Sequence, residues 1–152
     1  MSAGSATKSK SLFRMECAVR IDIHAAPEKI WALLTDAAAF PRWNSTVKSI
    51  EGRIAPGETL KLVTTAVPDR VFKLRVSAFT PPQTMVWRDG AAPMFQGVRT
   101  YTLTPRGSGV TEFAMSEVFS GLMLPMIAGS LPDFGPSFER YAADLKKAAE
   151  SR

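Results

Sequence analysis

Apolar and polar residues alternate most cleanly in residues 13–23. The apolar positions, every second residue, are Phe13, Met15, Cys17, Val19, Ile21 and Ile23. Alternation over this length predicts a long β-strand with one buried face. Pro27 and Glu28 follow, and both residue types are favoured in the first turn of a helix. We therefore expect a short helix from this point, and then a second short helix or turn whose length is limited by Pro41.

Alternation returns in a series of segments separated by turn-forming residues. The expected strands are residues 45–54, 58–67, 70–79 and 84–89, followed by a hairpin over residues 97–119. Apolar spacing then changes to steps of four and three, at Phe134, Phe138, Tyr141 and Leu145. This spacing predicts a long amphipathic C-terminal helix that begins between about residues 131 and 137.

The order of these elements predicts an α+β fold. We expect a curved seven-stranded antiparallel sheet wrapped around the C-terminal helix, with two short helices after the first strand. A sheet with one apolar face needs a cover, and the amphipathic helix supplies one. A sheet that wraps around a helix without closing on it leaves a hollow between them. We expect residues 1–11 to be a disordered tail and residues 12–152 to form a single domain.

The hairpin over residues 97–119 places two charges on its apolar face. Arg99 and Glu117 share that face with Tyr101, Phe113, Met115 and Phe119. Two charges in a solid apolar core would cost several kcal/mol each in desolvation. Three explanations stay open: a pair on a cavity wall that holds a polar ligand group, a purely structural salt bridge, or a bulge that turns one residue to solvent.

Aromatic and methionine side chains are abundant on the faces expected to point inward. Taken singly, each is better explained by core packing, and Trp43 by packing of the short helices onto the sheet. Taken together, they suit a flat or cyclic apolar ligand. The candidate ligand-binding residues are Trp43, Met85, Trp87, Phe95, Arg99, Tyr101, Phe113, Met115, Glu117, Phe119, Phe138 and Tyr141.

Several classes of enzyme chemistry lack their usual residues. The single histidine, His24, is expected to face outward, which leaves no histidine base, no Ser/His/Asp triad and no zinc set. We therefore expect no metal and no cofactor. If the protein is an enzyme, Arg99, Tyr101 and Glu117 are the catalytic candidates, acting by orientation of a reactive substrate.

Composition restricts the partners and the compartment. The net charge is +5, but the basic residues are scattered, so we expect no nucleic-acid partner. The longest apolar stretch is far shorter than the roughly 20 residues that span a bilayer, so we expect no stable membrane insertion. The single cysteine, Cys17, cannot form an internal disulfide, which fits a cytoplasmic location.

Several segments follow one another in a characteristic order: AAPEKIWALLTDAAAFPRWN, MVWRDG, MFQGVRTYTLTP with GSGVTEF, SEVFSGLMLP and FERYAADLKKAAE. In this order the chain resembles the helix-grip superfamily of START domains and birch-pollen allergens, in particular its SRPBCC group, often labelled polyketide cyclase/dehydrase-like. The resemblance covers about residues 13–150. The resemblance implies a helix-grip fold and a ligand cavity but not one reaction, because members include lipid carriers, hormone receptors, aromatase/cyclases and co-chaperone domains.

Three functional hypotheses follow. The first is binding or transport of a small hydrophobic ligand that is lipid-like, aromatic or polyketide-like. The second is a cyclase- or aromatase-like enzyme that uses no metal. The third is a co-chaperone-like interaction module, which leaves a protein partner open. We expect a monomer or a weak dimer.

Overall fold

The computed structural model describes residues 4–131 and 133–151, and within them eight strands form one antiparallel sheet. Their order across the sheet is β1-β2-β8-β7-β6-β5-β4-β3. The strands are β1 (Ser5–Ser11), β2 (Arg14–Ile23), β3 (Val47–Glu51), β4 (Thr59–Thr64), β5 (Phe72–Thr80), β6 (Thr84–Ala91), β7 (Phe95–Gly107) and β8 (Val110–Ser120). The helices are α1 (Pro27–Leu34), η1 (Ala37–Ala39), α2 (Phe40–Trp43), α3 (Leu124–Ile127), η2 (Ala128–Ser130) and α4 (Gly135–Glu150).

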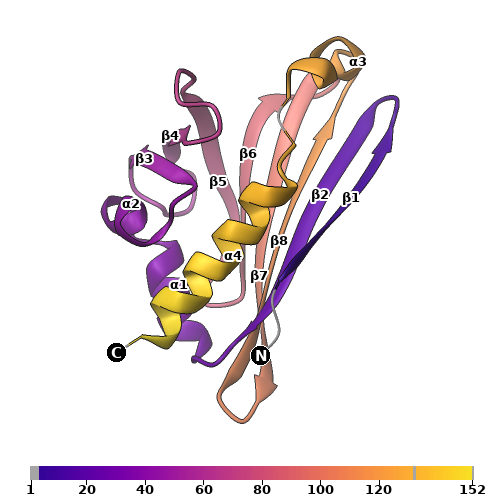
Figure 1. The fold of residues 1–152 in the computed structure, drawn as a ribbon. Helices are drawn as coiled ribbons and strands as arrows, with labels where there is room; N and C mark the ends of the chain where they lie inside the picture. The colour runs from indigo at the N-terminus through magenta and orange to yellow at the C-terminus, as the bar shows by residue number, and fades with distance from the viewer. Residues whose placement is uncertain (1–3, 132, 152) are drawn as a thin grey trace.

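The long helix α4 crosses the concave face of the sheet (Figure 1). Pro136 occupies its first turn, and its apolar residues recur on one face because of the four-and-three spacing. Phe138, Tyr141, Ala142 and Leu145 are buried against the sheet. This arrangement confirms the α+β helix-grip fold. No helix in the described residues is long and apolar enough to cross a membrane.

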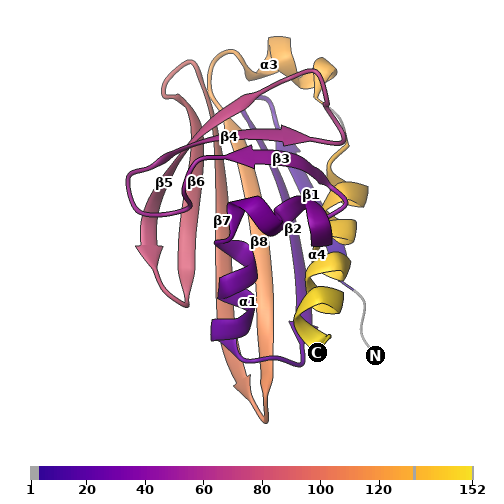
Figure 2. The same ribbon diagram turned by 90° about the vertical axis from the view of Figure 1, so that its left-hand side faces the viewer.

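The helices α1, η1 and α2 connect β2 to β3 and lie beside α4 (Figure 2). Ile30, Trp31 and Leu34 form the buried face of α1. Asp36 accepts a hydrogen bond from the backbone N–H of Ala39, which caps η1. Two short helices after the first long strand, as expected, are therefore present as α1 and the η1–α2 pair.

The expected disordered tail over residues 1–11 is corrected for residues 5–11, which form the edge strand β1. It pairs with β2 from Ser5↔Arg20 to Ser11↔Arg14, and this strand raises the count from seven to eight. Contacts to the C-terminal region also hold it: Ala6 N–H donates to Glu139 Oε2 (3.2 Å), and Lys8 Nζ lies 3.0 Å from Asp133 Oδ1. A polar edge strand buries little apolar surface, so its sequence does not show the usual alternation. Residues 1–3 lie outside the described residues.

Strands β7 and β8 form the hairpin that the sequence predicted, with Arg99 directly opposite Glu117. The register between them shifts only between Pro105 and Gly107, next to the turn. The bulge hypothesis, in which one of the two charged residues turns to solvent, is therefore wrong.

Candidate ligand-binding site

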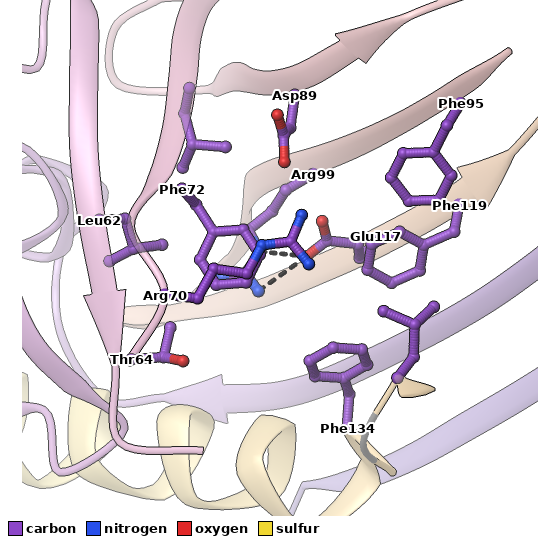
Figure 3. A pocket seen from close by; sticks show the side chains of 12 residues that line it. Leu62, Thr64, Arg70, Phe72, Asp89, Phe95, Arg99, Glu117, Phe119 and Phe134 are labelled. Carbon is purple, nitrogen blue, oxygen red and sulfur yellow. Dashed lines mark hydrogen bonds and ion pairs between the residues drawn. The ribbon is translucent and has the colours of Figure 1, made fainter. Parts of the chain in front are cut away.

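A small pocket opens on the concave side of the sheet, beyond the N-terminal end of α4 (Figure 3). Its volume is about 50 Å³, which is room for a few water molecules. The walls come from β4 to β8 and from the segment before α4. The lining residues are Leu62, Thr64, Arg70, Phe72, Leu74, Asp89, Phe95, Arg99, Glu117, Phe119, Leu131 and Phe134. Most are apolar, so the four charged side chains define where a ligand could make polar contacts.

The Arg99–Glu117 ion pair lies on the pocket wall (Figure 3). Arg99 Nε and Arg99 Nη2 lie 2.8 Å and 2.7 Å from the same oxygen, Glu117 Oε1. The two side chains are only 14% and 13% exposed. Arg99 also places its guanidinium carbon 5.2 Å from the centre of the Phe138 ring, a cation–π contact. The pair is therefore well formed without a ligand.

Two tyrosines extend this polar group into the core. Tyr141 Oη donates to Tyr101 Oη at 3.3 Å. Burial raises the pKa of both phenols, and the neighbouring Arg99 only partly offsets this. Burial alone would lower the pKa of Arg99, but attraction to Glu117 and contact with Tyr101 outweigh it, so the pKa of Arg99 is raised. Both tyrosines are therefore neutral hydrogen-bonding groups beside a fixed cation.

Arg70 and Asp89 supply the other two charges of the pocket. The guanidinium carbon of Arg70 lies 4.7 Å from the centre of the Phe72 ring. Burial raises the pKa of the Asp89 carboxyl, against the opposing influence of Arg70 and of the Gly90 backbone N–H. Asp89 therefore takes up a proton at a higher pH than an ordinary aspartate does.

The structure brings together only part of the predicted ligand-binding set. Phe95, Arg99, Glu117 and Phe119 line the pocket. Phe138 and Tyr141 line a neighbouring pocket of about 30 Å³, which shares Arg99 as a wall residue.

Five further candidates, all in the sheet, are buried in the core and line neither of these two pockets: Met85, Trp87, Tyr101, Phe113 and Met115. Two helices cover this part of the sheet: Tyr141 of α4 packs on Phe113 and Tyr101, and Phe40 of α2 packs against Trp87 with 6.3 Å between ring centroids. The rings of Tyr141 and Phe113 stack 6.1 Å apart, and those of Tyr141 and Tyr101 are also 6.1 Å apart. Trp43 packs against Phe40 and Tyr141, which is the packing role considered for it from the sequence.

Several pocket residues were missed at the level of sequence. Asp89 lies in the strand expected over residues 84–89 but was not among the candidates; it continues the alternation of Met85 and Trp87 along β6, and this signal could have identified it. Leu62 and Phe72 also lie in expected strands, but neither was among the candidates. Arg70 lies in a loop, where the sequence pattern predicts no direction for the side chain.

The described residues contain no cluster of three His, Cys, Asp or Glu side chains that could hold a metal ion. His24 is largely exposed and contacts Glu150, with 3.2 Å between Nδ1 and Oε2. Its outward position agrees with the sequence prediction.

Residues 14–150 match the model of the family described as "Polyketide cyclase / dehydrase and lipid transport". The chain belongs to this family. The match spans every strand except β1, together with all the helices. A search of curated proteins found no match.

Several solved structures have a similar fold at low sequence identity. A START superfamily protein from Mycobacterium smegmatis has a TM-score of 0.65 and 19% identity, covering 89% of this chain and 97% of its own. Truncated norcoclaurine synthase from Thalictrum flavum has a TM-score of 0.65 and 14% identity, covering 97% and 98%. The di-domain ARO/CYC protein BexL of the BE-7585A biosynthetic pathway has a TM-score of 0.67 and 14% identity, covering 94% of this chain and 52% of BexL. At these identities the likeness establishes the shared fold.

Proposed function

We propose that the protein binds a small hydrophobic molecule in the pocket of Figure 3. The observation that carries this proposal is an apolar pocket with a complete, well-paired Arg99–Glu117 ion pair in its wall. Because this pair satisfies its own charges, it can contact a hydroxyl or carbonyl group without requiring a charged ligand. Family membership supports the same reading, since the family description includes lipid transport.

The size of the pocket indicates how a ligand would be accommodated. A volume of about 50 Å³ is well below the roughly 300–1,000 Å³ of typical small-molecule sites. Leu131 and Phe134 line the pocket from the short connection between η2 and α4 rather than from the hydrogen-bonded sheet. We infer that the side chains of Leu131 and Phe134 move outward when the ligand enters.

The test is binding of the dye ANS to the folded protein, and its displacement by dodecanoate. Leu131→Trp should fill the pocket and weaken dye binding by about tenfold, whereas Val71→Trp, on the outer face beside Lys61 and Lys73, should leave it unchanged. Absence of ANS and dodecanoate binding to the wild type would refute the proposed function. Equal binding by both variants would place the ligand elsewhere.

A cyclase-like activity is the second candidate, favoured by one observation: Asp89 brings a carboxyl group with a raised pKa to the pocket. Such a carboxyl could exchange protons with a reactive polyketide-like substrate. Arg99 and Glu117 could orient that substrate, but Tyr101 is fully buried behind them and acts only through Arg99. Turnover of a poly-β-ketone that is lost in Asp89→Asn, with ANS binding intact, would establish this activity.

A further inference from the structure

Exposed hydrophobic side chains gather at one end of the molecule. Of the six large hydrophobic residues that are exposed in the described part of the chain, five lie at this end, and we call them the apolar tip: Leu12, Phe13, Met94, Leu122 and Met126. Their exposed fractions run from 47% for Phe13 to 77% for Met126. The sixth, Val71, lies on the outer face of β3 to β5. Such clustering on a folded protein marks an interaction surface.

Backbone hydrogen bonds hold the segments of the tip together. The N–H of Gly121 donates to the carbonyl of Phe13 (3.2 Å), and the N–H of Met123 donates to that of Met94 (2.8 Å). Figure 1 shows α3 and the β1–β2 turn at the same end of the sheet. Gly121 allows this approach, because a Cβ at its position would collide with the carbonyl oxygen of Met94. The tip is therefore one built surface rather than a set of unrelated loops.

The three chain segments that form the tip carry basic residues and no acidic ones. Residues 8–14, 91–96 and 119–127 contain Lys8, Lys10 and Arg14 but no aspartate or glutamate. Lys8 pairs with Asp133 and Arg14 pairs with Glu16. Lys10 is exposed and forms no salt bridge with any residue in 4–131 or 133–151. The tip therefore combines apolar side chains with an uncompensated positive charge.

The tip is also continuous with the pocket. Phe95 follows Met94 of the tip, and its ring stacks on Phe119 with 6.1 Å between centroids. Phe119 in turn stacks on Phe134 at 5.4 Å. All three rings line the pocket. An apolar path thus leads from the exposed end to the ligand site.

We propose that the apolar tip docks the protein reversibly onto the surface of a bilayer that contains anionic lipid. A bilayer interface accepts apolar side chains and attracts basic ones at the same time. A symmetric pairing of two tips would instead bring their lysines and arginines together, which opposes association. Docking through the tip goes beyond the proposed function, because it concerns where the ligand is collected or delivered and not whether it is bound.

The test is co-sedimentation with vesicles of phosphatidylcholine, with and without about one third phosphatidylglycerol. Binding should be stronger to the anionic vesicles, and Lys10→Glu should weaken it by at least about fivefold. The double variant Leu122→Ser with Met126→Ser should weaken binding by about tenfold or more, because two apolar side chains no longer enter the interface. Val71→Ser is the control, because Val71 is an apolar residue that is 53% exposed, close to the 58% of Leu122, but lies on the outer face of β3 to β5. This variant should bind like the wild type.

All these residues are exposed and lie outside the pocket, so circular dichroism and ANS binding in solution should stay unchanged in each variant. If the wild type does not bind ANS in solution, the proposed ligand binding in the pocket is refuted, but the proposed membrane docking of the tip is not affected. Absence of vesicle binding by the wild type, or equal binding by the tip and Val71 variants, would overturn the proposal. The proposal would also be overturned if the wild type does not bind vesicles but forms a dimer in sedimentation velocity that the tip variant dissociates. The tip would then be a self-association surface.

Discussion

Breaking the Arg99–Glu117 pair should test how strongly water solvates the pocket wall. Arg99→Met leaves Glu117 with most of its side chain buried and without its cation. Two unit charges 4 Å apart attract by about 4 kcal/mol at an effective dielectric constant of 20. Removing one partner of a buried pair costs about 3–5 kcal/mol, whereas a well-solvated pair costs about 1 kcal/mol or less. Because both side chains are less than 15% exposed, we expect a loss of about 3 kcal/mol.

The assay is equilibrium unfolding in urea, followed by tryptophan fluorescence. Arg106→Met is the control, since Arg106 Nη2 also contacts a glutamate across the hairpin, at 2.9 Å from Glu112 Oε2, but its side chain is 49% exposed. That change should cost less than about 1 kcal/mol. The double variant Arg99→Met with Glu117→Gln should recover about half of the loss, because no unpaired charge remains. Equal losses for Arg99→Met and Arg106→Met would contradict the reasoning and show that the pocket wall is fully solvated.

Two further predictions concern other parts of the molecule. The Glu150 carboxylate accepts hydrogen bonds from the His24 backbone N–H and from Lys146, which lower its pKa from 4.5 to about 2. The stabilisation from these bonds should therefore be complete above pH 4.5 and disappear as the pH falls towards 2. In urea unfolding, the wild type should exceed Glu150→Gln in stability by about 1 kcal/mol at neutral pH, and the two should converge at low pH. Gly121→Ala should destabilise the protein by about 1–3 kcal/mol, because this residue has φ +126° and no room for a Cβ beside Met94. Gly129→Ala is the control and should have little effect in the same measurement, because a Cβ there meets no atom within 4 Å. Equal losses of stability in the two variants would show that the approach of Gly121 to Met94 is not tight.

The sequence pattern was most informative where burial is strong and local. The alternation over residues 13–23 anticipates β2, which runs from Arg14 to Ile23, and the four-and-three spacing anticipates the buried face of α4. The cross-strand position of Arg99 and Glu117 also followed from the pattern, because a turn near Arg106 sets the register of the whole hairpin. These features depend on residues close in sequence.

The pattern could not show which part of the concave face stays uncovered. Alternation places Met85, Trp87 and Phe95 on the same face of the sheet, but the packing of the helices decides that Met85 and Trp87 are buried in the core and that Phe95 lines a pocket. The strand β1 was missed for a related reason. It is held by backbone pairing with β2 and by the polar contacts of Ala6 and Lys8, and neither leaves an apolar repeat in the sequence.

The placement of α4 explains why a closed core and a ligand pocket can share one sheet. Phe138, Tyr141 and Leu145 seal the concave face along the helix, while beyond its N-terminal end Leu131 and Phe134 line the pocket. Arg99 lies at the boundary, with Phe138 beside its guanidinium, Tyr101 behind it and the pocket before it. A charge can remain there because Glu117 and the tyrosine hydroxyl replace the water that the core excludes. A ligand that enters from the apolar tip would therefore stop at Arg99, where the apolar path through Phe95, Phe119 and Phe134 ends.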